Sequence, residues 1–354
     1  MAGLKMAMIN GIKPMPGSGD GITEYAYSMC AQMRKRGAVK LVYSIEQAKK
    51  NDAVGLLQIN SMLKMKAADI GNKDYDIYHL LNHEVGFAAK AIKLADKSNK
   101  IVTTVHDLAR FQNGLHVGIL QTAYSRMVMN SVKDAVFNSD FLIFDSNQTM
   151  RDVRNRFGNV KGEVVNIGID ERMFSSAKPR KREKFSVGYI GSFAHHKNVP
   201  LLLRAAKLLR DDGVEFCVYG VGTEKGLLEQ YVKDNSLKCV HLMGFADESK
   251  KREIYDGFSV FVFPSMYEGF GLPILEAQAR GLPVIIYKKG KISEEIRKYC
   301  IEADDEEHMA ELIMNLKKNG YGERRRSEAI RYARSFTWKR CASKTFNIYN
   351  KVLQ

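Results

Sequence analysis

The feature that most constrains the fold is an alternation of short apolar runs with amphipathic segments. The apolar runs have the length of buried strands, and the segments between them place apolar residues every three or four positions, as helices do. Strands that alternate with helices along a chain form parallel sheets covered by helices. In the first half, strands are predicted at 40–44, 53–59, 77–81, 101–105 and 141–145, and helices at 22–36 and 86–97.

A second series of the same kind begins near residue 185. Its predicted strands are 186–190, 215–219, 240–243 and 260–264, and its predicted helices are 199–210, 227–235 and 249–257. The stretch 178–184 between the two series is highly charged and contains one proline, which is typical of a solvated interdomain linker. A chain of 354 residues also suits two domains with a core each. We therefore predict two doubly wound α/β domains, 1–177 and 185–336, with a ligand cleft between them.

Composition excludes several classes of protein. Hydrophobic residues make up 45% of the chain and charged residues 27%, with 7 prolines, so disordered and collagen-like chains are excluded. The five cysteines are scattered without a Cys-x-x-Cys spacing, which indicates neither a disulfide framework nor a thiolate zinc site. We see no export signal and no apolar run of membrane-spanning length. A cytoplasmic protein is expected.

The net charge of +15 favours a polyanionic partner, such as nucleic acid or an anionic membrane surface. The basic clusters carry no interleaved aromatic residues, which a surface that stacks on bases would need. Nucleic acid is therefore the less expected partner, and peripheral contact with the inner face of a membrane is the alternative. The clusters lie at 34–36, 178–184, 288–291 and 324–326.

The stretch 263–277, which reads FPSMYEGFGLPILEA, carries the most information about function. It follows a predicted strand, and Pro273 stands where the first turn of a helix tolerates a residue without an N–H group. Gly269 and Gly271 allow backbone amides to approach a ligand closely. The start of the predicted helix 272–281 also attracts negative charge, so an anion site is predicted here.

Two glutamates flank this predicted anion site. Glu268 precedes the helix and Glu276 lies in its first turns, where both would repel a phosphate but accept hydrogen bonds from sugar hydroxyls. The Glu-x₇-Glu spacing, with both glycines and the proline, resembles the motif of retaining GT-B-fold glycosyltransferases of family 4, which use nucleotide-sugar donors. The resemblance extends over nearly the whole chain. It implies two Rossmann-like domains that face each other across a cleft, with a C-terminal helix, about 337–354, packing back on the first domain.

The same resemblance implies a donor site in the second domain. Lys197 is similar to the family's lysine that binds the donor diphosphate, and a flexible cation there would stabilise the leaving group. Glu268 would orient the sugar, and Glu276 would hold the ribose. The other implied donor contacts are Gly191, Ser192, His196, Gly220, Gly222, Phe245, Gly269, Phe270, Gly271 and Leu272. Ser192 and His196 stand where the family commonly has an arginine, which predicts weaker or more pH-dependent diphosphate binding.

In the first domain, the stretch 16–22 reads PGSGDGI and resembles the family's glycine loop, so Gly19 and Gly21 are assigned to the site. Asp20 within it is an equally good candidate for a helix cap. His106 follows the predicted strand 101–105 and resembles the His-Asp-Leu of members that transfer mannose and related sugars. The resemblance implies that His106 lies beside the donor sugar and helps to position it. Ser146 is predicted to cap a helix.

The resemblance implies a front-face reaction in which Lys197, Glu268 and His106 are the catalytic residues and the departing phosphate acts as base. The expected donor is GDP-mannose or a UDP-sugar, and the expected acceptor is a hydroxyl of a lipid-linked, glycan or small-molecule compound. No metal or other cofactor is expected, because protein cations and the helix dipole would take the place of a metal ion. The stretch 74–76 spells Asp-x-Asp, the metal motif of the other major transferase fold, but so short a match arises by chance. Two alternatives stay open: a sugar-nucleotide epimerase, and a non-catalytic protein that binds polyanions.

Overall fold

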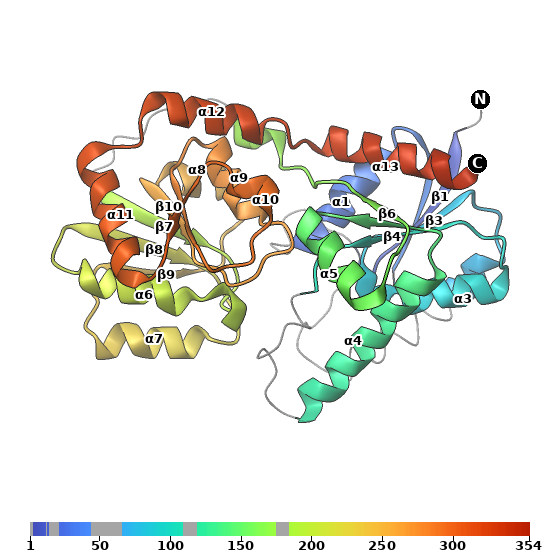
Figure 1. Ribbon diagram of the computed structural model, residues 1–354, viewed down its shortest axis with the longest axis horizontal. Coiled ribbons are helices and arrows are strands. Elements are labelled where there is room, and N and C mark those ends of the chain that lie inside the picture. The colour runs from blue at the N-terminus through green and yellow to red at the C-terminus, as the bar shows by residue number, and fades with distance from the viewer. Residues whose placement is uncertain (1–2, 12, 14–20, 44–65, 109–118, 175–183) are drawn as a thin grey trace. The chain divides into compact units, whose positions relative to one another are not determined.

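The computed structural model describes residues 3–11, 13, 21–43, 66–108, 119–174 and 184–354 (Figure 1). They form two compact units, each built around one parallel sheet. The first unit consists of Met1–Gly168 together with Trp338–Gln354, and the second of Ile169–Thr337.

The sheet of the first unit has six parallel strands in the order β2-β1-β3-β4-β5-β6. Strands β3, β4 and β5 are buried throughout. Their sequences are largely apolar, as expected for central strands of a parallel sheet, apart from the buried His79, Thr103 and Thr104. The strands are β1 (Leu4–Ile9), β2 (Gly37–Val42), β3 (Ile77–Leu80), β4 (Ile101–Val105), β5 (Phe141–Phe144) and β6 (Gly162–Val164). β1 and β6 are not among the predicted strands, and the predicted strand 53–59 lies outside the described residues.

The helices of the first unit include the last helix of the chain. They are α1 (Gly21–Met33), α3 (Phe87–Ala95), α4 (Ile119–Asn138), α5 (Asn147–Phe157) and α13 (Trp338–Leu353). Ser146 caps α5 as predicted, because its hydroxyl accepts a hydrogen bond from the Thr149 amide at 3.1 Å. As predicted, α13 packs on the first unit, where it lies beside α1 (Figure 1). Its Tyr349 hydroxyl contacts Nδ1 of the buried His79 on β3 at 2.5 Å.

The second sheet has the order β12-β11-β10-β7-β8-β9. The chain starts in the middle at β7, builds outward through β8 and β9, and then returns to the other side of β7 with β10. The strands are β7 (Phe185–Ile190), β8 (Val214–Tyr219), β9 (Val240–Gly244), β10 (Val260–Phe263), β11 (Val284–Tyr287) and β12 (Cys300–Ala303). The topological switch point therefore lies between β7 and β10, and open α/β sheets bind ligands at such a point, beyond the carboxyl ends of the strands.

Seven α-helices are described in the second unit. They are α6 (Val199–Leu208), α7 (Lys225–Asp234), α8 (Lys251–Asp256), α9 (Leu272–Ala279), α10 (Glu294–Arg297), α11 (Glu306–Asn319) and α12 (Glu323–Ala333). Those predicted at 199–210, 227–235 and 249–257 correspond to α6, α7 and α8, with ends that differ by a few residues.

The division between the units falls at residue 168, earlier in the chain than the boundary predicted at 177. The reason is packing: Met173 is buried, and its carbonyl accepts a hydrogen bond from Arg280, at the end of α9. Ile169 also pairs with Thr337 in a β-bridge. Of the predicted linker 178–184, only Lys184 is among the described residues.

None of the five cysteines forms a disulfide, and burial raises the pKa of the Cys30 thiol to about 11 and that of Cys300 to about 12. A thiol with a raised pKa is a poor nucleophile. Within the described part of the chain, no helix combines the length and the apolar composition needed to cross a bilayer.

Candidate functional site

Two loops at the switch point of the second sheet bring Lys197 and Glu268 together. β7 and β10 are neighbours in the sheet, so the loops that follow them start side by side. Lys197 Nζ lies 2.6 Å from Glu268 Oε1, and the two side chains are only 17% and 10% exposed. The ammonium also lies 5.6 Å from the centre of the Phe263 ring. Two residues 71 positions apart in the sequence thus form one partly buried ion pair.

Two hydrogen bonds, one from a backbone amide and one from a side chain, hold these two loops together. The Met266 amide donates to the carbonyl of His196 at 2.7 Å, and the Asn198 side-chain amide donates to the carbonyl of Pro264 at 3.2 Å. Asn198 has a φ of 51°, in the left-handed region that asparagine tolerates better than most residues. Lys197 therefore projects from a short 3-10 turn, His195–Lys197, that is tied to the Glu268 loop on both sides.

The Glu268 carboxylate has a second partner. Ser265 Oγ lies 2.6 Å from the same oxygen, Oε1, that contacts Lys197. The Glu268 backbone is also fixed, since its amide donates to the Lys291 carbonyl at 2.9 Å. Burial raises the pKa of the nearby Tyr189, and the charge of Glu268 raises it further. The site therefore holds a carboxylate between a cation and a hydroxyl.

Helix α9 begins at Leu272, as predicted, four positions after Glu268. Gly271 caps it with a φ of 102°, a conformation that favours glycine, and Pro273 stands in its first turn. Phe270, by contrast, is 4% exposed, and the centre of its ring lies 5.9 Å from the centre of the Phe336 ring. The side chain of Phe270 is part of the core, so only its backbone remains available for the predicted ligand contact.

Glu276 lies inside α9 with a donor on each carboxylate oxygen. Lys251 Nζ is 2.8 Å from Oε1, and the Tyr255 hydroxyl donates to Oε2 at 2.8 Å. Burial by itself lowers the pKa of Lys251, but the carboxylates of Glu276 and Glu248 raise it overall. Each carboxylate oxygen has more than one lone pair, so Glu276 can accept further hydrogen bonds from hydroxyls.

Lys251 and Tyr255, which hold the carboxylate of the candidate site residue Glu276, are not predicted from the sequence. The signal for them exists, because residues four apart on a helix such as α8 project from the same face. Nothing in the sequence indicates which face of α8 meets Glu276, which lies 25 residues away from Lys251.

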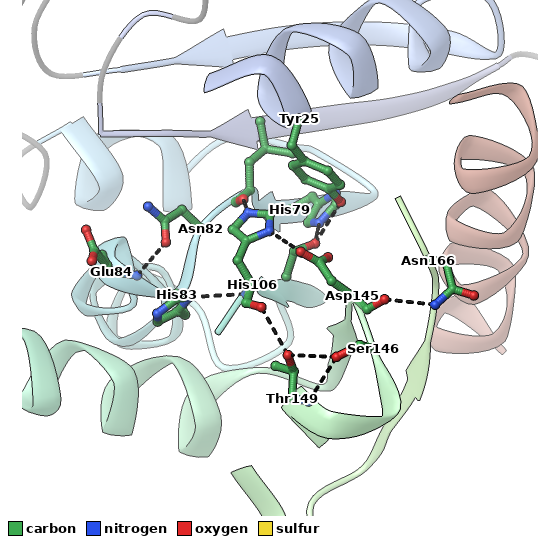
Figure 2. Close-up of polar contacts among 12 residues, drawn as sticks. Tyr25, His79, Asn82, His83, Glu84, His106, Asp145, Ser146, Thr149 and Asn166 are labelled. Carbon is green, nitrogen blue, oxygen red and sulfur yellow. Dashed lines mark hydrogen bonds and ion pairs between the residues drawn. The ribbon is translucent and has the colours of Figure 1, made fainter. Parts of the chain in front are cut away.

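In the first unit, both ring nitrogens of His106 are occupied (Figure 2). Nδ1 lies 2.6 Å from Asp145 Oδ2, at the end of β5, and Nε2 lies 2.8 Å from the carbonyl of Leu81. A carbonyl only accepts, so Nε2 carries a proton. A second proton must lie between Nδ1 and the carboxylate, since two bare acceptors would repel each other at this distance.

Aromatic and polar groups fix the surroundings of this histidine. The Tyr25 ring of α1 meets the His106 ring edge-on at 4.7 Å, and Tyr25 also shares a hydrogen bond of 2.9 Å with Thr104. Thr104 in turn contacts Nε2 of His79 at 2.8 Å. Burial lowers the pKa of His79 to about 3, so this second histidine is neutral. Elements α1, β3, β4, β5 and α13 all contribute to the network that surrounds His106.

Residues 170–336 match the family model described as glycosyl transferases group 1. The chain belongs to the group 1 glycosyltransferases. This second-unit match includes the ion pair, the start of α9 and the carboxylate of Glu276. The family membership confirms the resemblance stated above to GT-B glycosyltransferases of family 4.

Curated relatives match this group 1 glycosyltransferase over different lengths. It is 29% identical over 169 residues to O-antigen chain mannosyltransferase B of Escherichia coli, a match that covers 46% of this chain and 44% of that protein. It is 27% identical over 287 residues to glycogen synthase of Mycobacterium tuberculosis, covering 77% of this chain and 68% of the relative. The D-inositol 3-phosphate glycosyltransferase of Corynebacterium diphtheriae is 24% identical over 393 residues, with coverage of 94% and 91%.

Solved structures match this group 1 glycosyltransferase over nearly its full length. Sucrose-phosphate synthase from Thermosynechococcus elongatus has a TM-score of 0.78 at 18% identity, covering 98% of both chains. HepE from Anabaena, solved in complex with UDP and glucose, has a TM-score of 0.74 at 14% identity, covering 98% of this chain and 100% of that one. The predicted GT-B fold is therefore confirmed.

Three glycines of the predicted donor site, Gly191, Gly220 and Gly222, are needed by the packing of this glycosyltransferase itself. A Cβ on Gly220 would lie 2.1 Å from the carbonyl oxygen of Gly191 and 2.5 Å from the Phe193 ring. A Cβ on Gly191 would lie 2.6 Å from the Tyr189 hydroxyl, and a Cβ on Gly222 would lie 2.7 Å from the Phe193 backbone. These three glycines let the loops after β7 and β8 pack against each other.

The remaining predicted residues are dispersed. Phe245 follows β9 and is 53% exposed, and Ser192 is exposed with its carbonyl bonded to the Tyr189 hydroxyl at 2.9 Å. Gly21 is the first residue of α1, whereas Gly19 and Asp20 lie outside the described residues. Asp74 and Asp76 of the Asp-x-Asp match both bond to Lys5, by its side chain at 3.3 Å and its amide at 2.6 Å.

The His106–Asp145 pair predicts a pH-dependent stability of the first unit. Burial by itself lowers the pKa of His106, but the Asp145 carboxylate and the Leu81 carbonyl raise it from 6.5 to about 9. The folded pair therefore keeps a proton that the unfolded chain loses above pH 6.5. The pair stabilises the folded first unit fully below about pH 6.5, and this stabilisation is lost as the pH rises through about 9. Its size is about 1–3 kcal/mol.

Urea unfolding at several pH values measures this effect. Trp338, the single tryptophan, belongs to the first unit and lies 6.0 Å from the Tyr25 ring, so its fluorescence reports on that unit. The free energy of unfolding should fall between pH 6.5 and pH 9. In Asp145→Asn the fall should disappear, because the shared proton has lost its carboxylate. A fall of equal size in this variant would contradict the assignment.

Proposed function

We propose that this group 1 glycosyltransferase moves a sugar from a nucleotide-diphosphate donor to a hydroxyl acceptor, with retention of configuration at the anomeric carbon. The observation that carries the proposal is the Lys197–Glu268 ion pair beside the N-terminus of α9, at the switch point of the second sheet. A cation and a helix N-terminus attract a diphosphate, and the carboxylate beside them suits a sugar hydroxyl.

The leaving group is the diphosphate. An ammonium carries three N–H donors, so Lys197 can bind a phosphate oxygen while it keeps its hydrogen bond to Glu268. The N–H groups at the start of α9 add the positive end of the helix dipole. Charge grows on the phosphate oxygen as the bond to the sugar breaks, and fixed donors of this kind stabilise it without reorganising.

Each of the two glutamates is assigned to a different part of the donor. We propose that Glu268 accepts a hydrogen bond from a sugar hydroxyl and that Glu276 accepts hydrogen bonds from the ribose. This assignment is supported by their separation along the chain, since Glu268 precedes α9 and Glu276 lies within it. Lys251 and Tyr255 orient the Glu276 carboxylate, which leaves its remaining lone pairs in fixed directions.

In the reaction, the bond from the anomeric carbon to the diphosphate oxygen breaks and a bond to the acceptor oxygen forms on the same face. The acceptor proton passes to the departing phosphate, so no side chain has to act as base. Lys197 and α9 provide positive charge where other transferases use a metal ion. We propose that His106 helps to position the sugar by the shape of its ring, because both of its nitrogens are already bonded, to Asp145 and to the Leu81 carbonyl.

The identity of the donor and acceptor is the finer part of the proposal. We propose a UDP-sugar or GDP-mannose as donor, and a glycan, lipid-linked or polyol hydroxyl as acceptor. The names of the relatives, which include an O-antigen mannosyltransferase, a glycogen synthase and an inositol phosphate glycosyltransferase, support this range. The net charge of +15 supports a cytoplasmic enzyme that meets a lipid-linked acceptor at an anionic membrane surface.

A thermal-shift screen of UDP, GDP, ADP and their sugars tests the proposal, because a ligand that binds only the folded state raises the melting temperature. We expect stabilisation by at least one nucleotide sugar, and release of the nucleotide when candidate acceptors are added. A new sugar formed from the donor alone would identify an epimerase instead. Salt-dependent binding of nucleic acid without any nucleotide-sugar effect would favour the polyanion-binding alternative.

A further inference from the structure

Ser265 lies between the Lys197 loop and the Glu268 loop, at the second position after β10. It is 1% exposed. Its Oγ is 2.6 Å from Glu268 Oε1, 3.1 Å from the carbonyl of His196 and 3.1 Å from the carbonyl of Tyr267. All three neighbours are acceptors of hydrogen bonds.

A serine hydroxyl has one proton and can donate only one strong hydrogen bond. A bond to a charged carboxylate is shorter and stronger than one to a neutral carbonyl. The contact with Glu268 is the shortest of the three, so the proton of Ser265 points to the carboxylate. The backbone carbonyls of His196 and Tyr267 lie near Ser265 Oγ but do not receive its proton.

Glu268 Oε1 thus receives two donors at 2.6 Å each, the Ser265 hydroxyl and the Lys197 ammonium. These donors differ in stiffness. Lys197 has a long side chain that a diphosphate attracts, whereas Ser265 has a short one on a backbone held by neighbouring loops. When a phosphate shares the Lys197 ammonium, the Ser265 hydroxyl is the donor that serves Glu268 alone.

We propose that Ser265 is a positioning residue that holds the Glu268 carboxylate in place while Lys197 binds the donor diphosphate. The inference rests on the proposed function, because it assigns Ser265 a role through the sugar-orienting glutamate. A purely structural role, in which Ser265 only bridges the loops, predicts lower stability with unchanged turnover by the folded enzyme.

The test compares Ser265→Ala with Ser186→Ala. Ser186 on β7 is a matched control, since its largely buried hydroxyl donates to a backbone carbonyl, that of Gly257, at 2.6 Å.

Turnover is measured as release of UDP or GDP from the stabilising nucleotide sugar, with acceptor or with water. We expect kcat to fall about 10- to 100-fold in Ser265→Ala, as for a misplaced catalytic group. Affinity for the nucleoside diphosphate alone should change by less than a factor of about three, because the phosphate contacts remain.

Two further variants make the outcome decisive. Ser265→Ala combined with Glu268→Gln should be no slower than Glu268→Gln alone, because the serine acts through the carboxylate. Ser265→Cys keeps the shape but donates weakly, so its kcat should lie between those of the wild type and Ser265→Ala, even if the alanine variant proves unstable.

Unchanged kcat in folded Ser265→Ala and Ser265→Cys, or effects that multiply in the double variant, would overturn the inference. A wild-type protein that neither binds nor cleaves any nucleotide sugar would instead reject the proposed function, so the two failures are distinguishable.

Discussion

Lys197→Met should lower kcat/KM by a factor of about 10² to 10³, the usual cost of removing one preorganised donor to a developing negative charge. Methionine keeps most of the length of the lysine side chain but neither its charge nor its N–H groups. The affinity for a nucleoside diphosphate should fall, whereas the affinity for the nucleoside without phosphates should stay the same. Steady-state kinetics and calorimetric titration with the two ligands measure these effects.

Lys207→Met is the matched control, because Lys207 is exposed in the last turn of α6. Its kcat/KM should match that of the wild type. Lys197→Met should also destabilise the second unit, since Glu268 keeps its charge in a site where it is 10% exposed. Adding Glu268→Gln should recover that stability without recovering activity. If Lys197→Met kept more than a tenth of the wild-type kcat/KM, the diphosphate role of Lys197 would be wrong.

The second large effect concerns the glycine after β8. Gly220→Val should destabilise the second unit by about 3 kcal/mol, which is the upper range for overpacking of a buried position. The new Cβ would lie 2.1 Å from the Gly191 carbonyl oxygen, a backbone atom that cannot move without displacing the loop that leads to Lys197. Nucleotide-sugar binding should therefore be lost in the fraction that remains folded.

Gly226→Ala provides the comparison within the same unit. Gly226 lies in α7, and a Cβ added there meets nothing within 4 Å. Alanine has the higher helix propensity, so this variant should gain up to about 1 kcal/mol. Amide hydrogen exchange of second-unit peptides in urea measures both changes. A Gly220→Val variant as stable as the wild type would show that the loops after β7 and β8 can separate, contrary to the packing described here.

The sequence predicts best those features that depend on neighbouring residues. The predicted strand 101–105 matches β4 at both ends, because its five residues are all β-branched and buried and the strand is flanked by Lys100 and His106. The cap at Ser146 and the start of α9 at Leu272 are likewise local, and both are confirmed. The family motif also brought Lys197 and Glu268 into one prediction, although their role awaits the kinetics.

Pairings that depend on strand order could not be predicted. Asp145 meets His106 because β4 and β5 are adjacent, and Lys251 meets Glu276 because α8 turns one face toward α9. No residue pattern in the sequence indicates such partners. At Phe270 the motif predicts too much. It indicates a ligand contact, but the side chain is buried against Phe336.

The chain completes its first unit with its last residues. Ile169 and Thr337, at the two ends of the second unit, pair with each other, and Trp338–Gln354 then returns to the first. Because α13 follows the second unit in the chain, it is synthesised after every residue of that unit. The hydrogen bond between Tyr349 and His79 therefore forms only after the second unit has been synthesised, so a variant truncated after Thr337 should contain a complete second unit and an incomplete first unit.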